Sequence, residues 1–193
     1  AYWTHLSPNG FYADFVLKYG WMNHDFKVLD SSGATIKGDD IDTSGWSGSL
    51  EVGKRIYLGL EKQDRWYLEP QAQLTVSRQN GDRSTASNGL QTRVDSLKSM
   101  LGRIGLNIGY EVKSGKNPIH LYGKVSYLYE FEGDLGVSYN GIHVTEHLGD
   151  NWWSYGVGAT AQLGKNHRLY LDIERADGAR FRQPWAISGG YRF

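Results

Sequence analysis

Acidic and basic side chains recur at alternate positions along this chain, an arrangement that could bring carboxylates together for acid and base chemistry. The carboxylates are Glu51, Glu69, Glu111, Glu130, Asp172 and Glu174, and the cations that share their pattern are Arg55, Arg103, Lys124, Arg168 and Arg192. Paired carboxylates can donate and accept protons when their surroundings separate their pKa values. Balanced charges on one face also line a hydrated pore. We favour the pore lining and expect no enzymatic activity.

Two further groups have the chemistry of metal ligands. His143 and His147 have the i, i+4 spacing that pairs two imidazoles on a helix, but we interpret their segment as a hairpin, where this spacing has no such meaning. Asp39, Asp40 and Asp42 offer oxygen atoms for calcium, although not at the spacing of a recognised calcium-binding loop. We therefore expect no metal site and no cofactor.

The composition excludes several classes of function. Lys and Arg together number 21, as do Asp and Glu, so no net charge attracts nucleic acid, and we expect no nucleic-acid partner. The absence of cysteine excludes disulfides, thiolate metal sites and cysteine nucleophiles. No apolar run approaches the roughly 20 residues of a membrane-spanning helix. The 13% aromatic content and the 25 glycines are instead typical of a barrel with aromatic girdles.

The elements that position these charges are strands, because eight segments alternate apolar with polar residues at period two. The segments are 11–21, 47–58, 66–77, 100–111, 119–131, 153–163, 169–174 and 185–193. Alternation gives each strand two different faces. The residues that we expect on the polar, pore-lining face are Tyr12, Asp14, Lys18, Glu51, Arg55, Glu69, Gln71, Gln73, Arg103, Asn107, Glu111, His120, Lys124, Glu130, Asp172 and Glu174.

The connections between these strands alternate in length. Those near 7–10, 59–65, 113–118 and 164–168 are short, whereas 25–45, 78–98 and 132–151 are long and 176–184 is intermediate. Outer-membrane barrels have short periplasmic turns and longer outer loops. This rule puts the long connections outside and the C-terminus in the periplasm. The alternating stretch 137–145 is then a small hairpin within an outer loop, because counting it as a further strand would break the rule.

Charged polar faces favour a membrane barrel over a soluble one, since a soluble barrel would fill its interior with the apolar face. Trp and Tyr near the strand ends fit two interfacial girdles.

The last strand alternates Trp185, Ile187, Gly189, Tyr191 and Phe193 with small or polar residues. A terminal strand of this kind needs a partner for its backbone edge. At the other terminus AYWTH reads as the lower end of a strand whose remainder lies upstream.

These segments resemble the translocator domains of classical autotransporters, the type V secretion family. The similar stretches cover nearly the whole chain in the family's order: AYWTHLSPNGFYADFVLKYG, GSLEVGK, WYLEPQAQLTVSRQNGD, LGRIGLNIGYEV, LYGKVSYLYEFEGD, WWSYGVGATAQLG, LYLDIERADGARF and PWAISGGYRF. The segment YLEPQAQL and the aromatic C-terminus carry most of the resemblance.

The resemblance implies an all-β, antiparallel up-and-down transmembrane barrel of twelve strands, of which this chain holds eight as one domain, 1–193. It implies residence in the outer membrane of a Gram-negative bacterium, in contact with outer-membrane lipid, and export of an upstream passenger to the cell surface. The pore helix, about four strands and the passenger are absent from the sequence. Some family members cleave the passenger inside the barrel with acidic residues, and Glu69 would be the first candidate here.

The resemblance further implies that Trp185, Ile187, Gly189, Tyr191 and Phe193 form the signal read by the barrel-assembly machinery, which would pair with the edge of the terminal strand. From the residues alone, two other classes of protein remain open. A small outer-membrane barrel acting through its outer loops as an adhesin or enzyme has the same strands, and a soluble ligand-binding barrel has the same strand number.

Overall fold

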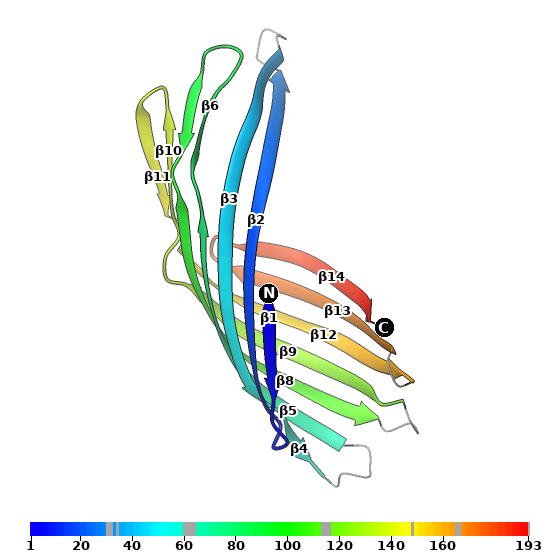
Figure 1. Cartoon of the computed structure of the whole chain (residues 1–193). Coiled ribbons are helices and arrows are strands. Elements are labelled where there is room, and N and C mark those ends of the chain that lie inside the picture. The colour runs from blue at the N-terminus through cyan, green and yellow to red at the C-terminus, as the bar shows by residue number, and fades with distance from the viewer. Residues whose placement is uncertain are drawn as a thin grey trace.

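The computed structural model describes residues 1–29, 33, 35–59, 65–112, 117–147, 149–164 and 167–192. Its elements are all strands (Figure 1): β1 (Tyr2–Leu6), β2 (Phe11–Leu29), β3 (Thr35–Lys54), β4 (Ile56–Leu58), β5 (Arg65–Gln79), β6 (Asp82–Thr85), β7 (Gln91–Val94), β8 (Leu97–Val112), β9 (Ile119–Glu130), β10 (Asp134–Tyr139), β11 (Ile142–His147), β12 (Asn151–Leu163), β13 (His167–Gly178) and β14 (Arg182–Arg192). Over these described ranges, no helix has the length and apolarity needed to cross a membrane.

The main sheet is an antiparallel meander in the order β1-β2-β3-β5-β8-β9-β12-β13-β14, with β4 paired to the start of β5. Figure 1 shows this sheet curling into part of a barrel wall. Within the described part of the chain no register joins β14 to β1 or β2, so the curl is open and both outermost strands present a backbone edge. The expected up-and-down order of the eight segments is confirmed.

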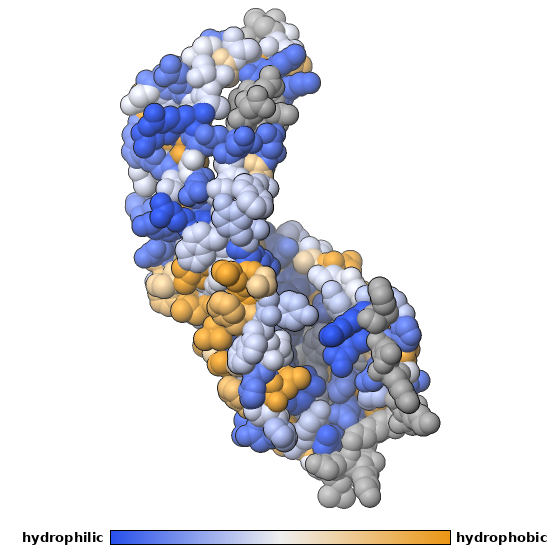
Figure 2. Space-filling view, in the orientation of Figure 1, coloured by the Kyte–Doolittle hydropathy of each residue, from blue (hydrophilic) through white to orange (hydrophobic). Residues whose placement is uncertain are grey.

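Alternation along each strand produces two unlike faces because successive side chains point to opposite sides of the sheet. In β5, Trp66 and Leu74 are 55% and 45% exposed, whereas Tyr67 and Glu69 are 2% and 6% exposed. Apolar side chains therefore lie on the convex outside and polar ones on the concave inside. Figure 2 shows the apolar side chains gathered in a band on the outer surface, below a largely hydrophilic upper part.

The two ends of the sheet differ. At one end of the sheet, which we call the turn end, few residues separate β4 from β5, β8 from β9 and β12 from β13. The other end, the loop end, bears the β2–β3, β6–β7 and β10–β11 hairpins. Two expected loops are in fact largely strand. β2 and β3 run far into 25–45, and β6 and β7 occupy part of 78–98. The hairpin expected at 137–145 is confirmed as β10 and β11.

The loop-end hairpins combine into a second sheet in the order β11-β10-β7-β6. Val137 lies opposite Val94 and Tyr139 opposite Thr92, which joins the two hairpins, and the backbone N–H of Ser87 donates to the carbonyl of Lys37 in β3. The sequence prediction found the β10–β11 hairpin but missed β6, β7 and the pairing between the two hairpins, because β6 and β7 are short and polar and pair with a hairpin instead of continuing the wall.

The AYWTH segment is confirmed as a strand. β1 pairs with β2 from Tyr2 opposite Val16 to Leu6 opposite Tyr12. It ends at a tight turn in which Gly10 adopts a positive φ of 82°, a conformation that costs glycine little.

Candidate functional site

The concave wall brings the predicted polar residues together on one face. The register aligns Asp14 with Glu51, Glu51 with Gln73 and Gln73 with Arg103, which makes a continuous polar row across β2, β3, β5 and β8. Directly opposed residues share a face, since the side-chain period of a strand is two. The predicted pore-lining set therefore occupies a single surface, the inside of the curl.

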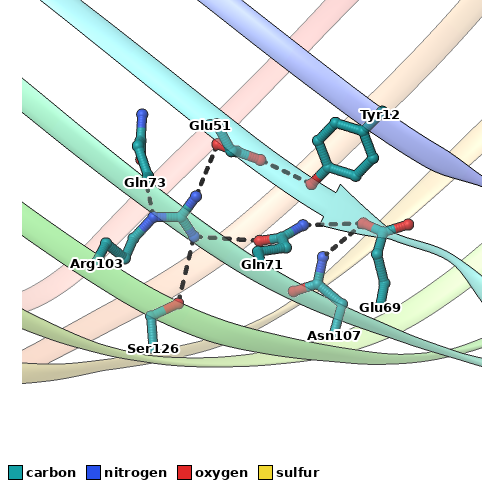
Figure 3. Close-up of polar contacts among 8 residues, drawn as sticks. All are labelled: Tyr12, Glu51, Glu69, Gln71, Gln73, Arg103, Asn107 and Ser126. Carbon is teal, nitrogen blue, oxygen red and sulfur yellow. Dashed lines mark hydrogen bonds and ion pairs between the residues drawn. The ribbon is translucent and has the colours of Figure 1, made fainter. Parts of the chain in front are cut away.

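Arg103 is the centre of the first polar cluster (Figure 3). Its guanidinium donates to Glu51 over 2.8 Å, to Gln73 over 2.9 Å and to Gln71 over 3.2 Å. Ser126 accepts a longer bond of 3.4 Å, and the Tyr12 hydroxyl donates to the other oxygen of Glu51 over 2.8 Å. The contact from β8 to β3 passes over β5, so it fixes three consecutive strands at once.

Glu69 holds the second cluster, next to the first. Arg55 donates to one carboxylate oxygen over 2.5 Å, and Gln71 and Asn107 donate to the other over 2.9 and 3.2 Å. The Arg55 guanidinium also lies 4.5 Å from the centre of the Tyr67 ring, a favourable cation–π contact. Both oxygens of Glu69 are thus engaged, by Arg55 between β3 and β4, by Gln71 on β5 and by Asn107 on β8. This arrangement supports a structural role for Glu69 over the cleavage role considered from the sequence.

Lys124 holds a third cluster farther along the curl. Its ammonium lies 3.1 Å from Asp172 and 2.8 Å from Glu174, across β12 from its own strand. The Tyr122 hydroxyl donates to Asp172 over 2.9 Å, and the Ser154 hydroxyl donates to Glu174. In these three clusters the carboxylates and cations are paired locally, so their charges largely cancel.

The remaining predicted residues stand apart from these clusters. Glu111 lies 3.8 Å from Arg65 at the turn end, and Glu130, at the loop end, accepts bonds from the Ser99 hydroxyl and the Met100 backbone N–H. Asp14 Oδ1 and His120 Nδ1 are buried and find no hydrogen-bond partner within the described residues. Lys18 lies on the same face and is exposed. None of these brings a second carboxylate against Glu69.

Sequence reasoning missed a set of tyrosines that pack over glycines on the concave face. A Cβ built on Gly109 would lie 2.2 Å from Tyr67 Cζ, so any larger residue there collides with the ring. The equivalent pairs are Tyr12 on Gly53, Tyr122 on Gly158 and Tyr170 on Gly190. Each tyrosine sits on one strand and its glycine on the next, so only the register reveals the pairs.

The residues considered for metal binding lie in the loop-end hairpins. His143 contacts the Ser138 and Thr145 hydroxyls, and His147 lies 2.7 Å from Asp134. Asp42 accepts a bond from Asn23 over 2.8 Å, whereas the side chains of Asp39 and Asp40 are outside the described residues.

A carboxylate fastens the last loop-end connection to its neighbour. Asp150, just before β12, accepts the backbone N–H groups of Arg180 over 2.7 Å and Phe181 over 3.1 Å. These bonds, with one from the Asn151 N–H, lower the pKa of Asp150 below its ordinary value. The Trp152 and Phe181 rings lie 5.0 Å apart beside it.

The predicted terminal strand is found as β14, which begins at Arg182, three residues before its predicted start. Trp185, Ile187, Gly189 and Tyr191 lie in β14, with Ile187 opposite Ile173 on the convex face, and Phe193 lies outside the described residues. A register shift between Glu174 and Ala176 marks a β-bulge near the loop end of the β13–β14 pair.

An antiparallel sheet that curls with an apolar convex face and a charge-paired concave face is the wall of an outer-membrane β-barrel. The family model for the autotransporter beta-domain matches residues 1–174. The chain belongs to the autotransporter β-domain family, whose members reside in the outer membrane of Gram-negative bacteria.

Relatives of known name agree with this assignment. The chain is 39% identical over 195 residues to the pertactin autotransporter of Bordetella bronchiseptica, and 36% identical over 192 residues to the probable autotransporter YcgV of Escherichia coli K12. Each match covers 100% of the chain, which spans only 21% and 20% of those proteins. The crystal structure of the β domain of the Bordetella autotransporter BrkA superposes with a TM-score of 0.80 at 32% identity, over 100% of this chain and 70% of that one.

Proposed function

We propose that this chain supplies much of the wall of a twelve-stranded outer-membrane barrel that carries a passenger, encoded upstream, to the cell surface. The observation that carries the proposal is the inverted polarity of the sheet. Outward residues such as Ile104 and Val157 are 63% and 60% exposed, and only a lipid environment makes such a face favourable. The open edges at β1 and β14, and the part of the BrkA domain beyond the match, support further strands that complete the wall.

The proposed pore is lined by the sixteen concave residues predicted from the sequence. Several of their charges are paired within the wall, as in Arg103 with Glu51 and Lys124 with Glu174. A lining of this kind stays hydrated without strongly attracting either charge sign, which suits passage of a polypeptide of any sequence and the seating of a pore helix. No reaction is part of the proposed role, and the relatives named above are described as autotransporters, not as enzymes.

The proposed orientation places the loop end at the cell surface, and the turn end and the C-terminus in the periplasm. The long β2–β3 hairpin and the β11-β10-β7-β6 sheet all lie at the loop end, and outer-membrane barrels carry their long connections outside.

The proposed signal for the barrel-assembly machinery is the terminal strand, Trp185, Ile187, Gly189, Tyr191 and Phe193. Among the described residues β14 is the last strand of the sheet, so one of its backbone edges lies at the sheet's end beside an apolar convex face, where Tyr191 is 56% exposed. A strand of the assembly machinery would pair with this edge of β14, a contact of the kind called β-augmentation.

The test uses the full-length protein in the outer membrane, with an epitope in its passenger. The Y191S/F193S variant should lower the membrane yield of heat-modifiable barrel by about tenfold and surface epitope in proportion, because apolar anchoring is lost. The control is I142S/V144S, which removes apolar side chains from the exposed strand β11. Equal barrel yields from the two variants would refute the assembly signal, and surface epitope that persists without any folded barrel would refute the translocator.

A loop-based adhesin is the second candidate function, and the ordered loop-end sheet is the observation that favours it. Tyr139, Ile142 and Val144 are 48%, 71% and 51% exposed on that sheet, and aromatic and aliphatic side chains of this kind anchor protein contacts. One relative, 26% identical to this chain, is described as the autotransporter adhesin/invasin TibA of Escherichia coli. Cell binding by a passenger-deleted barrel, abolished by I142S/V144S, would distinguish adhesion from export.

A further inference from the structure

The convex face carries an apolar groove at the position where β9 lacks a side chain. Two hollows of about 800 and 440 Å³ adjoin there, and both are lined by Ile108, Gly123, Val157 and Ile173. A Cβ on Gly123 would meet only the Gly156 carbonyl oxygen, at 3.9 Å, so the floor of the groove is open. Because the shared residues come from β8, β9, β12 and β13, the two hollows form one groove across the lipid-facing surface.

The two ends of the groove differ in chemistry. Trp66 and Tyr110, whose ring centres lie 5.1 Å apart, line its turn end. Arg175, Tyr155 and Trp185 line its loop end. Arg175 lies opposite Tyr155 in the register, three residues before the end of β13, and therefore points outward like its neighbours Ile173 and Leu171.

The charge around Arg175 is not balanced. Asp177 accepts Arg175 Nε over 2.6 Å and the Tyr155 hydroxyl over 2.8 Å, and Arg182 Nε lies 3.3 Å from the same carboxylate. Two guanidinium groups thus share one carboxylate, which leaves one net positive charge at the loop end of the groove. An outward-facing cation is costly in a barrel wall unless it reaches the headgroup layer and meets a negative partner there.

We propose that this groove binds one lipopolysaccharide molecule of the outer leaflet, with an acyl chain over Gly123 and a lipid A phosphate on Arg175 and Arg182. The proposal rests on the proposed function, because it requires the loop end to face the cell surface. An apolar groove with a cationic end matches an acyl chain with an anionic headgroup, and Arg forms bidentate bonds with phosphate. Tyr155 and Trp185 supply the interfacial aromatic contacts that border such a site.

The test counts lipid on the full-length protein extracted from outer membranes in mild detergent, by native mass spectrometry. Wild-type barrel should retain one lipopolysaccharide molecule. G123L fills the groove with a side chain that the lipid-facing surface tolerates, and should lower this occupancy by about tenfold through lost acyl contacts. R175Q keeps Asp177 paired with Arg182 and should lower occupancy by roughly fivefold. The control A72L adds the same side chain on the convex face of β5, outside the groove, and should retain wild-type occupancy.

The outcomes separate this proposal from the proposed function. The proposed lipid site would be overturned if G123L retained as much lipopolysaccharide as A72L. It would also be overturned if the wild-type barrel bound added phosphatidylglycerol or phosphatidylethanolamine equally well. Membrane fractionation and passenger display are measured on the same samples. A barrel absent from the outer membrane would contradict the proposed function, whereas normal display with no bound lipopolysaccharide would contradict only the groove.

Discussion

The barrel wall and the loop-end sheet are both antiparallel, but they are held together differently. In the wall, β5 and β8 pair from Arg65 opposite Glu111 to Gln79 opposite Leu97, and the side chains of Arg103 and Glu51 are only 21% and 22% exposed. In the loop-end sheet, β7 and β10 share a short register, and the side chains of the Arg93–Asp95 ion pair are 54% and 36% exposed. We therefore expect the wall to unfold cooperatively and the loop-end sheet, which has a shorter register and more exposed contacts, to open at a lower free energy.

The difference between the two sheets predicts that the largest loss of stability follows a substitution where the wall is packed most tightly. Gly109→Val should destabilise the barrel by about 3 kcal/mol, because the new side chain must displace the Tyr67 ring. Gly123→Val, on the convex face of a neighbouring strand, should change stability by less than about 0.5 kcal/mol. Urea titration of heat-modifiable mobility measures both. Similar midpoints for the two variants would show that concave packing does not limit the stability of the wall.

Removal of a charged contact should lower stability by a smaller amount, and by different amounts in the wall and in the loop-end sheet. Arg103→Met removes donors to Glu51, Gln71, Gln73 and Ser126. It should cost about 2 kcal/mol, a value reduced from that of a fully buried pair because the wall is partly hydrated. Arg93→Met should cost about 0.5 kcal/mol or less, because its pair is exposed. The same urea titration measures both variants. If the Arg93 variant were as unstable as the Arg103 variant, the contrast between a cooperative wall and a less stable loop-end sheet would be wrong.

The smallest effect should be confined to the loop-end sheet. Asn140 adopts a positive φ of 47°, and it exchanges two 2.9 Å bonds with the Gln91 backbone, one through its own N–H and one through its side chain. Asn140→Ala should cost about 1 kcal/mol, since it loses a bond and disfavours that conformation. Amide exchange should accelerate in β6, β7, β10 and β11 only. Asn88→Ala, within the β6–β7 turn, is the control. Faster exchange throughout β5 and β8 would mean that the two sheets unfold as one unit.

The wall strands could be predicted from the sequence because lipid and water impose opposite demands on alternate residues. Leu68, Glu69, Pro70 and Gln71 show this directly, with each residue on the face that its chemistry indicates. The registers put the predicted polar residues on the concave face, and their role as a pore lining stays a prediction. The sequence did not indicate which charges pair, because Arg103 reaches Glu51 only after β5 is aligned between them.

Strands β6 and β7 and the Tyr–Gly pairs lay beyond sequence reasoning for different reasons. β6 reads Asp-Arg-Ser-Thr and lies in one environment, so alternation carries no information there. Tyr67 and Gly109 are in contact only through the register of β5 and β8, which periodicity leaves undetermined.

The reach of Arg103 across β5 also bears on the order in which the wall can form. A single hairpin holds only two strands, so neither β3–β5 nor β5–β8 alone contains both Arg103 and Glu51. The ion pair forms only when the third strand arrives in register, and a slip of one residue would turn one of its partners to the lipid side. A third strand in the wrong register cannot form this ion pair, so the pair stabilises only the correct alignment of β3, β5 and β8.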